Sequence, residues 1–61
     1  MKRTDLLRHL RKHECCLLRE GRSHSWWHNG MKDLHSAVPR HREINELLAQ
    51  KICRDLGIPV P

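Results

Sequence analysis

Apolar residues recur along this chain with two different periods, which predict helices near both ends and strands between them. Leu6, Leu7 and Leu10 share one stripe at 3.6 residues per turn, so their spacing predicts a first helix over 4–13. A second stripe of the same period predicts a last helix over 45–56. Its members are Leu48, Ala49, Ile52, Cys53 and Leu56. Each helix therefore has one apolar side to bury.

Residues suited to helix ends flank both stripes. Thr4 is a good N-cap for the first helix, and Asn45 is a good N-cap for the last. Gly57 supplies the left-handed residue that commonly ends a helix, and Pro59 prevents continuation. We therefore expect side-chain caps at Thr4 and Asn45.

Three short segments between the helices are typical of strands, over 15–19, 24–28 and 34–38. Gly21 lies in the first connection, and Asn29-Gly30 is a strong turn signal for the second. The order α-β-β-β-α predicts a two-layer α+β fold. In this fold a three-stranded antiparallel sheet carries two helices on one face.

Alternation along 24–28 divides its side chains between two faces. His24, Trp26 and His28 share one face, while Ser25 and Trp27 share the other. Only one tryptophan can then lie fully in the core, and we expect it to be Trp27.

The length and charge of the chain limit what it can be. Sixty-one residues make one domain at most, here 1–61. Twelve lysines and arginines against seven acidic residues give a formal charge of +5, which favours a polyanion or an acidic protein as partner. A well-solvated surface with surplus cations is the alternative. No apolar run approaches the roughly 20 residues that span a membrane, so we expect a soluble protein.

The cysteines and histidines predict neither a disulfide nor a metal site. Three cysteines, two of them adjacent at Cys15 and Cys16, fit a reduced cytoplasmic setting in which they act as small buried hydrophobes. No histidine aligns with a cysteine as partner of a nucleophile. His9 and His13 have helical i, i+4 spacing but lack a third ligand nearby. We expect no metal and no cofactor.

His24 is the strongest candidate for chemistry, because it lies between a turn and a strand on a basic scaffold. A titratable imidazole there suggests reactions at phosphate, with RNA favoured because its 2′-OH can serve as the nucleophile. An ordinary surface histidine, one of six, is the alternative. Trp26 beside Arg19 and Arg22 offers stacking and phosphate neutralisation for a single strand. The same residue types also anchor protein interfaces, so both kinds of partner stay open.

Nearly the whole chain resembles the HicA-type toxins of bacterial toxin–antitoxin pairs. These are small messenger-RNA interferases with a fold like a double-stranded-RNA-binding domain. The residues that carry the resemblance are Lys2–Leu7, Gly21–His24, Trp27, Val38–His41 and Ile52–Ile58.

The resemblance implies a catalytic histidine at His24, because the family's histidine follows a Gly-Ser pair and Ser23 matches its serine. Here the glycine lies one place earlier, at Gly21, with Arg22 intervening. Cys15 stands where the family often has a bulky aromatic residue, which suggests that the core is filled elsewhere.

The implied activity is metal-independent endoribonuclease cleavage of messenger RNA. The implied partner is a HicB-type antitoxin, and no DNA is expected for this chain alone. His28, Ser23 or water would supply the second proton. The residues expected to bind RNA are Arg19, Arg22, Ser23, Trp26, His28 and Arg40.

Two other functions compete with this hypothesis. One is a non-catalytic RNA-binding module, or an orphan toxin-like protein that has lost activity. The other is a pure interaction protein. RNA breakdown that depends on His24 would discriminate between them.

Overall fold

The α-β-β-β-α order predicted from the sequence is confirmed by the computed structural model, which describes residues 1–61. Each strand continues one residue beyond its predicted end. The elements are α1 (Arg3–Lys12), β1 (Cys15–Glu20), β2 (His24–Asn29), β3 (Leu34–Pro39) and α2 (Glu46–Asp55).

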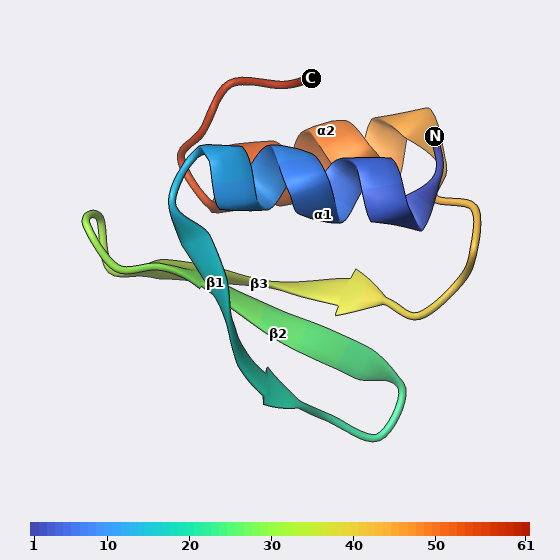
Figure 1. Cartoon of the computed structure of the whole chain (residues 1–61), viewed down its shortest axis with the longest axis horizontal. Helices are drawn as coiled ribbons and strands as arrows, with labels where there is room; N and C mark the ends of the chain where they lie inside the picture. Colours follow the sequence, from blue (N-terminus) through green and yellow to red (C-terminus); the bar gives the residue numbers. More distant parts are fainter.

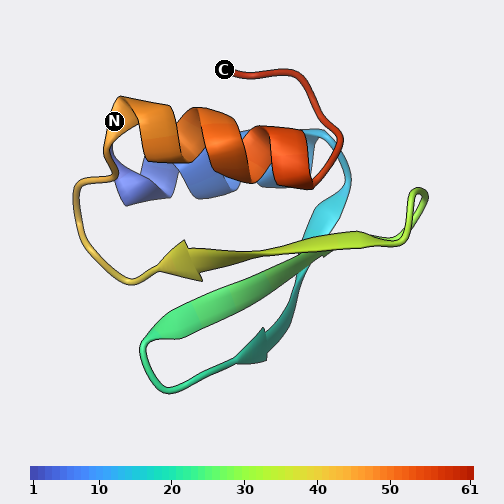
Figure 2. The same cartoon turned by 180° about the vertical axis from the view of Figure 1, so that it is seen from behind.

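The three strands form one antiparallel sheet in the order β1-β2-β3, so β2 is central. Both helices lie on the same face of this sheet, and no element covers the other face (Figures 1 and 2). In the register, His24 pairs with Pro39 and His28 pairs with His35. Leu18 forms a bulge in β1, which shifts the pairing with β2 by one residue. The uncovered face of the sheet is called the open face below.

The core lies between the helices and the sheet, and Trp27 is its one aromatic residue. Trp27 is 2% exposed whereas Trp26 is only half-buried, which confirms the prediction that one tryptophan enters the core. Leu48, predicted to be in the apolar stripe, is 36% exposed and lies at the rim. The remaining core residues are Leu6, Leu7, Leu10, Cys15, Val38, Ile44, Ala49, Ile52, Cys53 and Leu56.

The predicted cap at Thr4 is wrong, because α1 begins one residue before it. Lys2 is the N-cap and makes no side-chain capping bond. Lys2 forms a bridge with Glu43, and the backbone N–H of Arg3 donates to the carbonyl of Arg42 at 2.9 Å. A neighbouring segment thus satisfies an N–H group that a capping side chain normally serves.

The other predicted helix ends are confirmed. The Asn45 side chain accepts from the backbone N–H of Leu47 at 2.8 Å and from that of Leu48 at 3.4 Å. Gly57 has a φ of +69°, the left-handed conformation that ends α2. Neither helix has the length and apolar character needed to cross a membrane.

Two polar contacts tie α2 to the sheet. Asn29, predicted only as a turn residue, is buried at the end of β2, and its Nδ2 donates to the carbonyl of Leu56 at 2.7 Å. Ser36 on β3 donates to Asp55 at 3.3 Å. A hydrogen bond from Lys51 to the same carboxylate lowers the pKa of Asp55. These contacts attach the C-terminal end of α2 to the sheet at the end remote from His24.

We expect Trp27→Ala to destabilise the protein by about 3–5 kcal/mol, because it removes the largest core side chain. Trp26→Ala, which changes the half-buried tryptophan on the open face, is the matched control and should cost less. Urea unfolding followed by circular dichroism measures both changes without relying on tryptophan fluorescence. An equal loss of unfolding free energy in the two variants would contradict the assignment of Trp27 as the core residue.

Candidate nucleic-acid interface

His24 is the first residue of β2, and its imidazole lies exposed on the open face. It follows the turn of residues 21–23, which the backbone N–H of Gly21 closes by donating to the carbonyl of His24 at 2.8 Å. The Ser23 hydroxyl lies 3.2 Å from Nδ1 of His24. This contact leaves Nε2 of the ring directed to solvent or to a ligand.

Gly21 packs closely against β2, which favours a residue without a side chain at this position. A Cβ added to Gly21 would lie 3.1 Å from the His24 carbonyl oxygen and 3.2 Å from Nε1 of Trp26. Both distances are tighter than ordinary van der Waals contact, so a side chain here would displace the turn or the indole. This close approach explains why the glycine of the turn lies before Arg22.

A polar network on the other side of the sheet braces the end that carries His24. Ser25 is fully buried, accepts from Nη2 of Arg3 at 2.9 Å and donates to Oε1 of Glu20 at 2.5 Å. Arg40 donates to the same Glu20 oxygen at 3.1 Å and also to the carbonyl of Gly21. The ends of all three strands and the start of α1 are therefore held together beneath the turn.

Trp26 lies at the centre of the open face with two side chains against it. The Arg19 guanidinium carbon lies 5.5 Å from the centre of the indole, a cation–π distance. The His35 ring meets the indole edge-on, with the ring centres 6.1 Å apart. A nucleotide base that stacks here meets either the indole or the plane of Arg19, and proteins use both as stacking surfaces.

The two other histidines of the open face lie at the far end of the strands. His28 pairs with His35 across the sheet, and its Nε2 lies 3.3 Å from a carboxylate oxygen of Asp33. Four residues of strand separate His28 from His24, a distance of about 13 Å. This separation disfavours His28 as a direct proton partner of His24 and favours Ser23 or water.

The predicted RNA-binding residues do not all lie on one surface. Arg19, Trp26 and His28 share the open face with His24, and Ser23 and the exposed Arg22 lie in the adjoining turn. Arg40 instead turns toward Glu20 and helps to brace the sheet.

Sequence reasoning missed His35, which lies on the open face beside Trp26. Its place depends on its pairing with His28, and the length of the connection between β2 and β3 sets that pairing. The alternation of side chains along residues 34–38 was the sequence feature that could have placed His35 on one face of the sheet.

The cysteines divide into two buried thiols and one exposed thiol. Burial raises the pKa of Cys15 and of Cys53, so both stay protonated and unreactive near neutral pH. Cys16 is exposed on the open face, so the expectation that every cysteine is buried is wrong for this residue. Its pairing with His28 in a strand that alternates faces explains the difference. No cluster of three or more metal-binding side chains is present.

Comparison with protein families matches residues 3–58 of the chain to the family described as the HicA toxin of bacterial toxin–antitoxin systems. The match spans all five elements and includes the turn that carries His24. The family resemblance drawn from the sequence is thereby confirmed. No curated protein and no solved structure gives a significant match to the chain.

We expect one of the three thiols to react quickly with Ellman's reagent in the folded protein, because only Cys16 is exposed. The buried thiols should react after denaturation. Counting the thiols modified before and after addition of guanidinium tests this expectation. Cys16→Ser should remove the fast phase, and a fast phase that persists in this variant would place a second thiol at the surface.

Proposed function

The chain belongs to the HicA toxin family, and we propose that it acts as a metal-independent endoribonuclease on messenger RNA in the cytoplasm. One observation carries the proposal: the exposed imidazole of His24 lies on an uncovered sheet face, 3.2 Å from a serine hydroxyl. An acid–base group with basic and aromatic neighbours is what 2′-OH attack on phosphate needs.

In the proposed reaction His24 removes the proton from a ribose 2′-OH, and the resulting oxygen attacks the adjacent phosphorus. The new O2′–P bond forms as the P–O5′ bond breaks, which leaves a cyclic phosphate and a 5′-hydroxyl. The departing 5′-oxygen gains a proton from Ser23 or from a water, which the imidazolium of His24 then reprotonates. A hydroxyl both donates and accepts, so Ser23 can stabilise either protonation state of Nδ1.

Three arginines near His24 are unequal candidates for balancing charge on the phosphoryl oxygens. Arg40 is engaged by Glu20, and Arg19 lies over Trp26. Arg22 is exposed, forms no ion pair and lies two residues before His24. We therefore assign the charge-balancing role to Arg22 and the stacking role to Arg19 and Trp26.

A non-catalytic RNA-binding module is the second candidate, and the pairing of Arg19 with Trp26 supports it. The ring and the guanidinium 5.5 Å above it form a stacking surface that requires nothing from His24. A protein that kept this surface and lost the reaction would still bind single strands.

We expect His24→Ala to reduce RNA cleavage by about 10²–10⁴-fold, the usual contribution of a positioned acid–base group. Folding should change little, because the imidazole is exposed and its one recorded hydrogen bond is with Ser23. Cleavage of a labelled messenger RNA fragment and growth arrest on expression are the two measurements. His41→Ala, which changes an exposed histidine outside the open face, is the matched control. Equal cleavage by wild type and folded His24→Ala would favour the non-catalytic module.

Toxins of this family are paired with an antitoxin. We infer that a HicB-type antitoxin covers the open face around His24, Trp26 and His28. A half-buried tryptophan under an arginine is a typical anchor of protein interfaces. Acidic groups on the partner would complement the basic surface and speed association.

We expect Trp26→Ala to weaken antitoxin binding by about tenfold or more, as loss of an interface anchor does. The partner to test is a purified HicB-type antitoxin, with affinity measured by calorimetry. Leu47→Ala changes an exposed apolar residue on α2 and serves as the control. An affinity that is the same in both variants would exclude the open face as the interface.

A further inference from the structure

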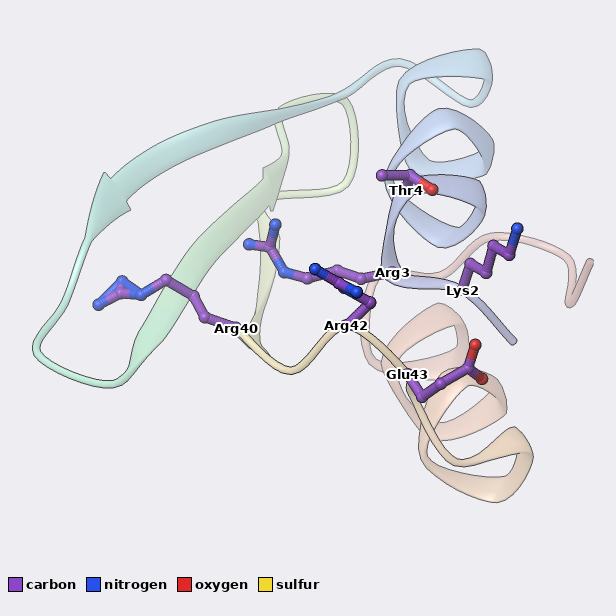
Figure 3. Close-up of a pocket in the computed structure, with 6 residues that line it drawn as sticks. All are labelled: Lys2, Arg3, Thr4, Arg40, Arg42 and Glu43. Carbon is purple, nitrogen blue, oxygen red and sulfur yellow. The ribbon is translucent and has the colours of Figure 1, made fainter.

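A basic hollow lies between the start of α1 and the segment that follows β3 (Figure 3). It encloses about 450 Å³ and has no apolar residue in its lining. Four of its six lining residues are cations. The lining consists of Lys2, Arg3, Thr4, Arg40, Arg42 and Glu43.

Three of the four cations in the hollow have no acidic partner. Lys2, Arg3 and Arg42 take part in no ion pair of the structure, whereas Arg40 pairs with Glu20. Glu43, the one carboxylate of the lining, lies 3.6 Å from the Met1 amino group. With four cations against one carboxylate in its lining, the hollow carries an excess of positive charge.

The hollow is held in place by the fold. Arg3 is half-buried, and its Nε donates to the Pro39 carbonyl at 2.9 Å while its Nη2 donates to Ser25. The backbone N–H of Arg3 donates to the Arg42 carbonyl, so the two arginines stand on adjacent segments. Both acceptors of the Arg3 side chain are neutral groups, so these contacts hold the guanidinium in place without an ion pair. A guanidinium fixed in this way is well suited to phosphate oxygens.

The hollow adjoins the end of the sheet that carries His24. Pro39 pairs with His24, and the next residue, Arg40, reaches from the lining to the carbonyl of Gly21 in the His24 turn. The turn of residues 21–23 and the connection between β3 and α2 lie on the same side of the molecule (Figures 1 and 2). An RNA strand that places one phosphate at His24 can continue around this end of the sheet to the hollow.

We propose that Lys2, Arg3 and Arg42 form a second phosphate site, which binds an RNA backbone phosphate flanking the one cleaved at His24. The proposal rests on the endoribonuclease function proposed above and adds three residues to those that the sequence assigns to RNA binding. RNA is favoured over an acidic protein segment because the lining lacks the apolar and aromatic groups that form the centre of protein interfaces. Phosphate contacts need cations alone, and they position the strand without reading its sequence.

The test uses the full chain with His24→Ala, so that the RNA stays intact during binding. A fluorescent single-stranded RNA is titrated at several salt concentrations, with and without the double change Lys2→Ala and Arg42→Ala. Each lost phosphate contact should reduce the slope of log K against log salt by about 0.7. Because the site binds one phosphate, we expect the slope to fall by about 0.7 and the affinity at low salt to fall with it.

Two further variants and one assay make the result specific. Lys12→Ala with Arg54→Ala removes the same two residue types from exposed positions outside the hollow, and it should change the slope less. Arg42→Lys keeps the charge and should retain most of the slope. In protein with His24 intact, the double change should raise KM and leave kcat nearly unchanged, as loss of uniform binding does.

Each outcome bears on one proposal or the other. A slope equal to that of the control pair would overturn the phosphate site and leave RNA cleavage by wild type, and so the proposed function, standing. Weaker antitoxin binding with an unchanged RNA slope would overturn it in favour of an acidic protein contact. If the unaltered protein neither binds nor cleaves RNA, the proposed function fails first and the phosphate site fails with it.

Discussion

The alternation of side chains along β2 is the constraint on which the rest of this structure depends. Both helices cover the same face of the sheet, so the central strand must place its core residues on that side alone (Figure 1). Ser25, Trp27 and Asn29 face the helices and are buried. His24 and Trp26 are thereby left on the open face, where polar and titratable groups cost the core nothing. A shift of one residue in the strand would exchange the two sets, so the core and the candidate site are fixed by the same register.

The buried polar residues on either side of Trp27 hold this register. Ser25 and Asn29 would each cost about 1–3 kcal/mol if left unpaired, but both find partners far away in sequence. Ser25 bonds to Arg3 of α1, and Asn29 bonds to the Leu56 carbonyl at the end of α2. Each helix is therefore attached to one end of the central strand. A chain this short has a small core, and these directional bonds specify a helix placement that apolar packing alone leaves loose.

The sequence allowed the element order and the burial of Trp27 to be predicted, because both follow from local periodicity. The cap at Asn45 was predictable for the same reason. The cap at Thr4 was not, because the carbonyl that serves α1 comes from Arg42, which lies next to it only in the folded chain. Asn29 appeared to be only a turn residue, since nothing local indicates the Leu56 carbonyl above it.

The residues of the candidate site also divide into those that local sequence predicts and those that depend on tertiary contacts. His24, Trp26 and Arg19 could be identified from one strand and its neighbours in sequence, aided by the family resemblance. His35 required the pairing of β2 with β3. Arg40 was predicted to bind RNA, but it is held by Glu20, a contact between the ends of two edge strands that local sequence does not reveal. Features that depend on one element were thus open to prediction, whereas the place of His35 and the pairing of Arg40 with Glu20 depend on contacts between elements.

Three of the unpaired cations of the chain are concentrated in one place, which the net charge of +5 alone does not reveal. Cations such as Arg8 and Lys51 are paired with acidic neighbours on their own helices. The unpaired Lys2, Arg3 and Arg42 gather instead at the end of the sheet that carries His24. Net charge by itself fits a polyanion and an acidic protein equally well. These cations are concentrated in a hollow without apolar lining, at the same end of the sheet as the exposed His24. This arrangement favours a phosphate backbone, because phosphates need only cations whereas a protein segment also needs apolar contact.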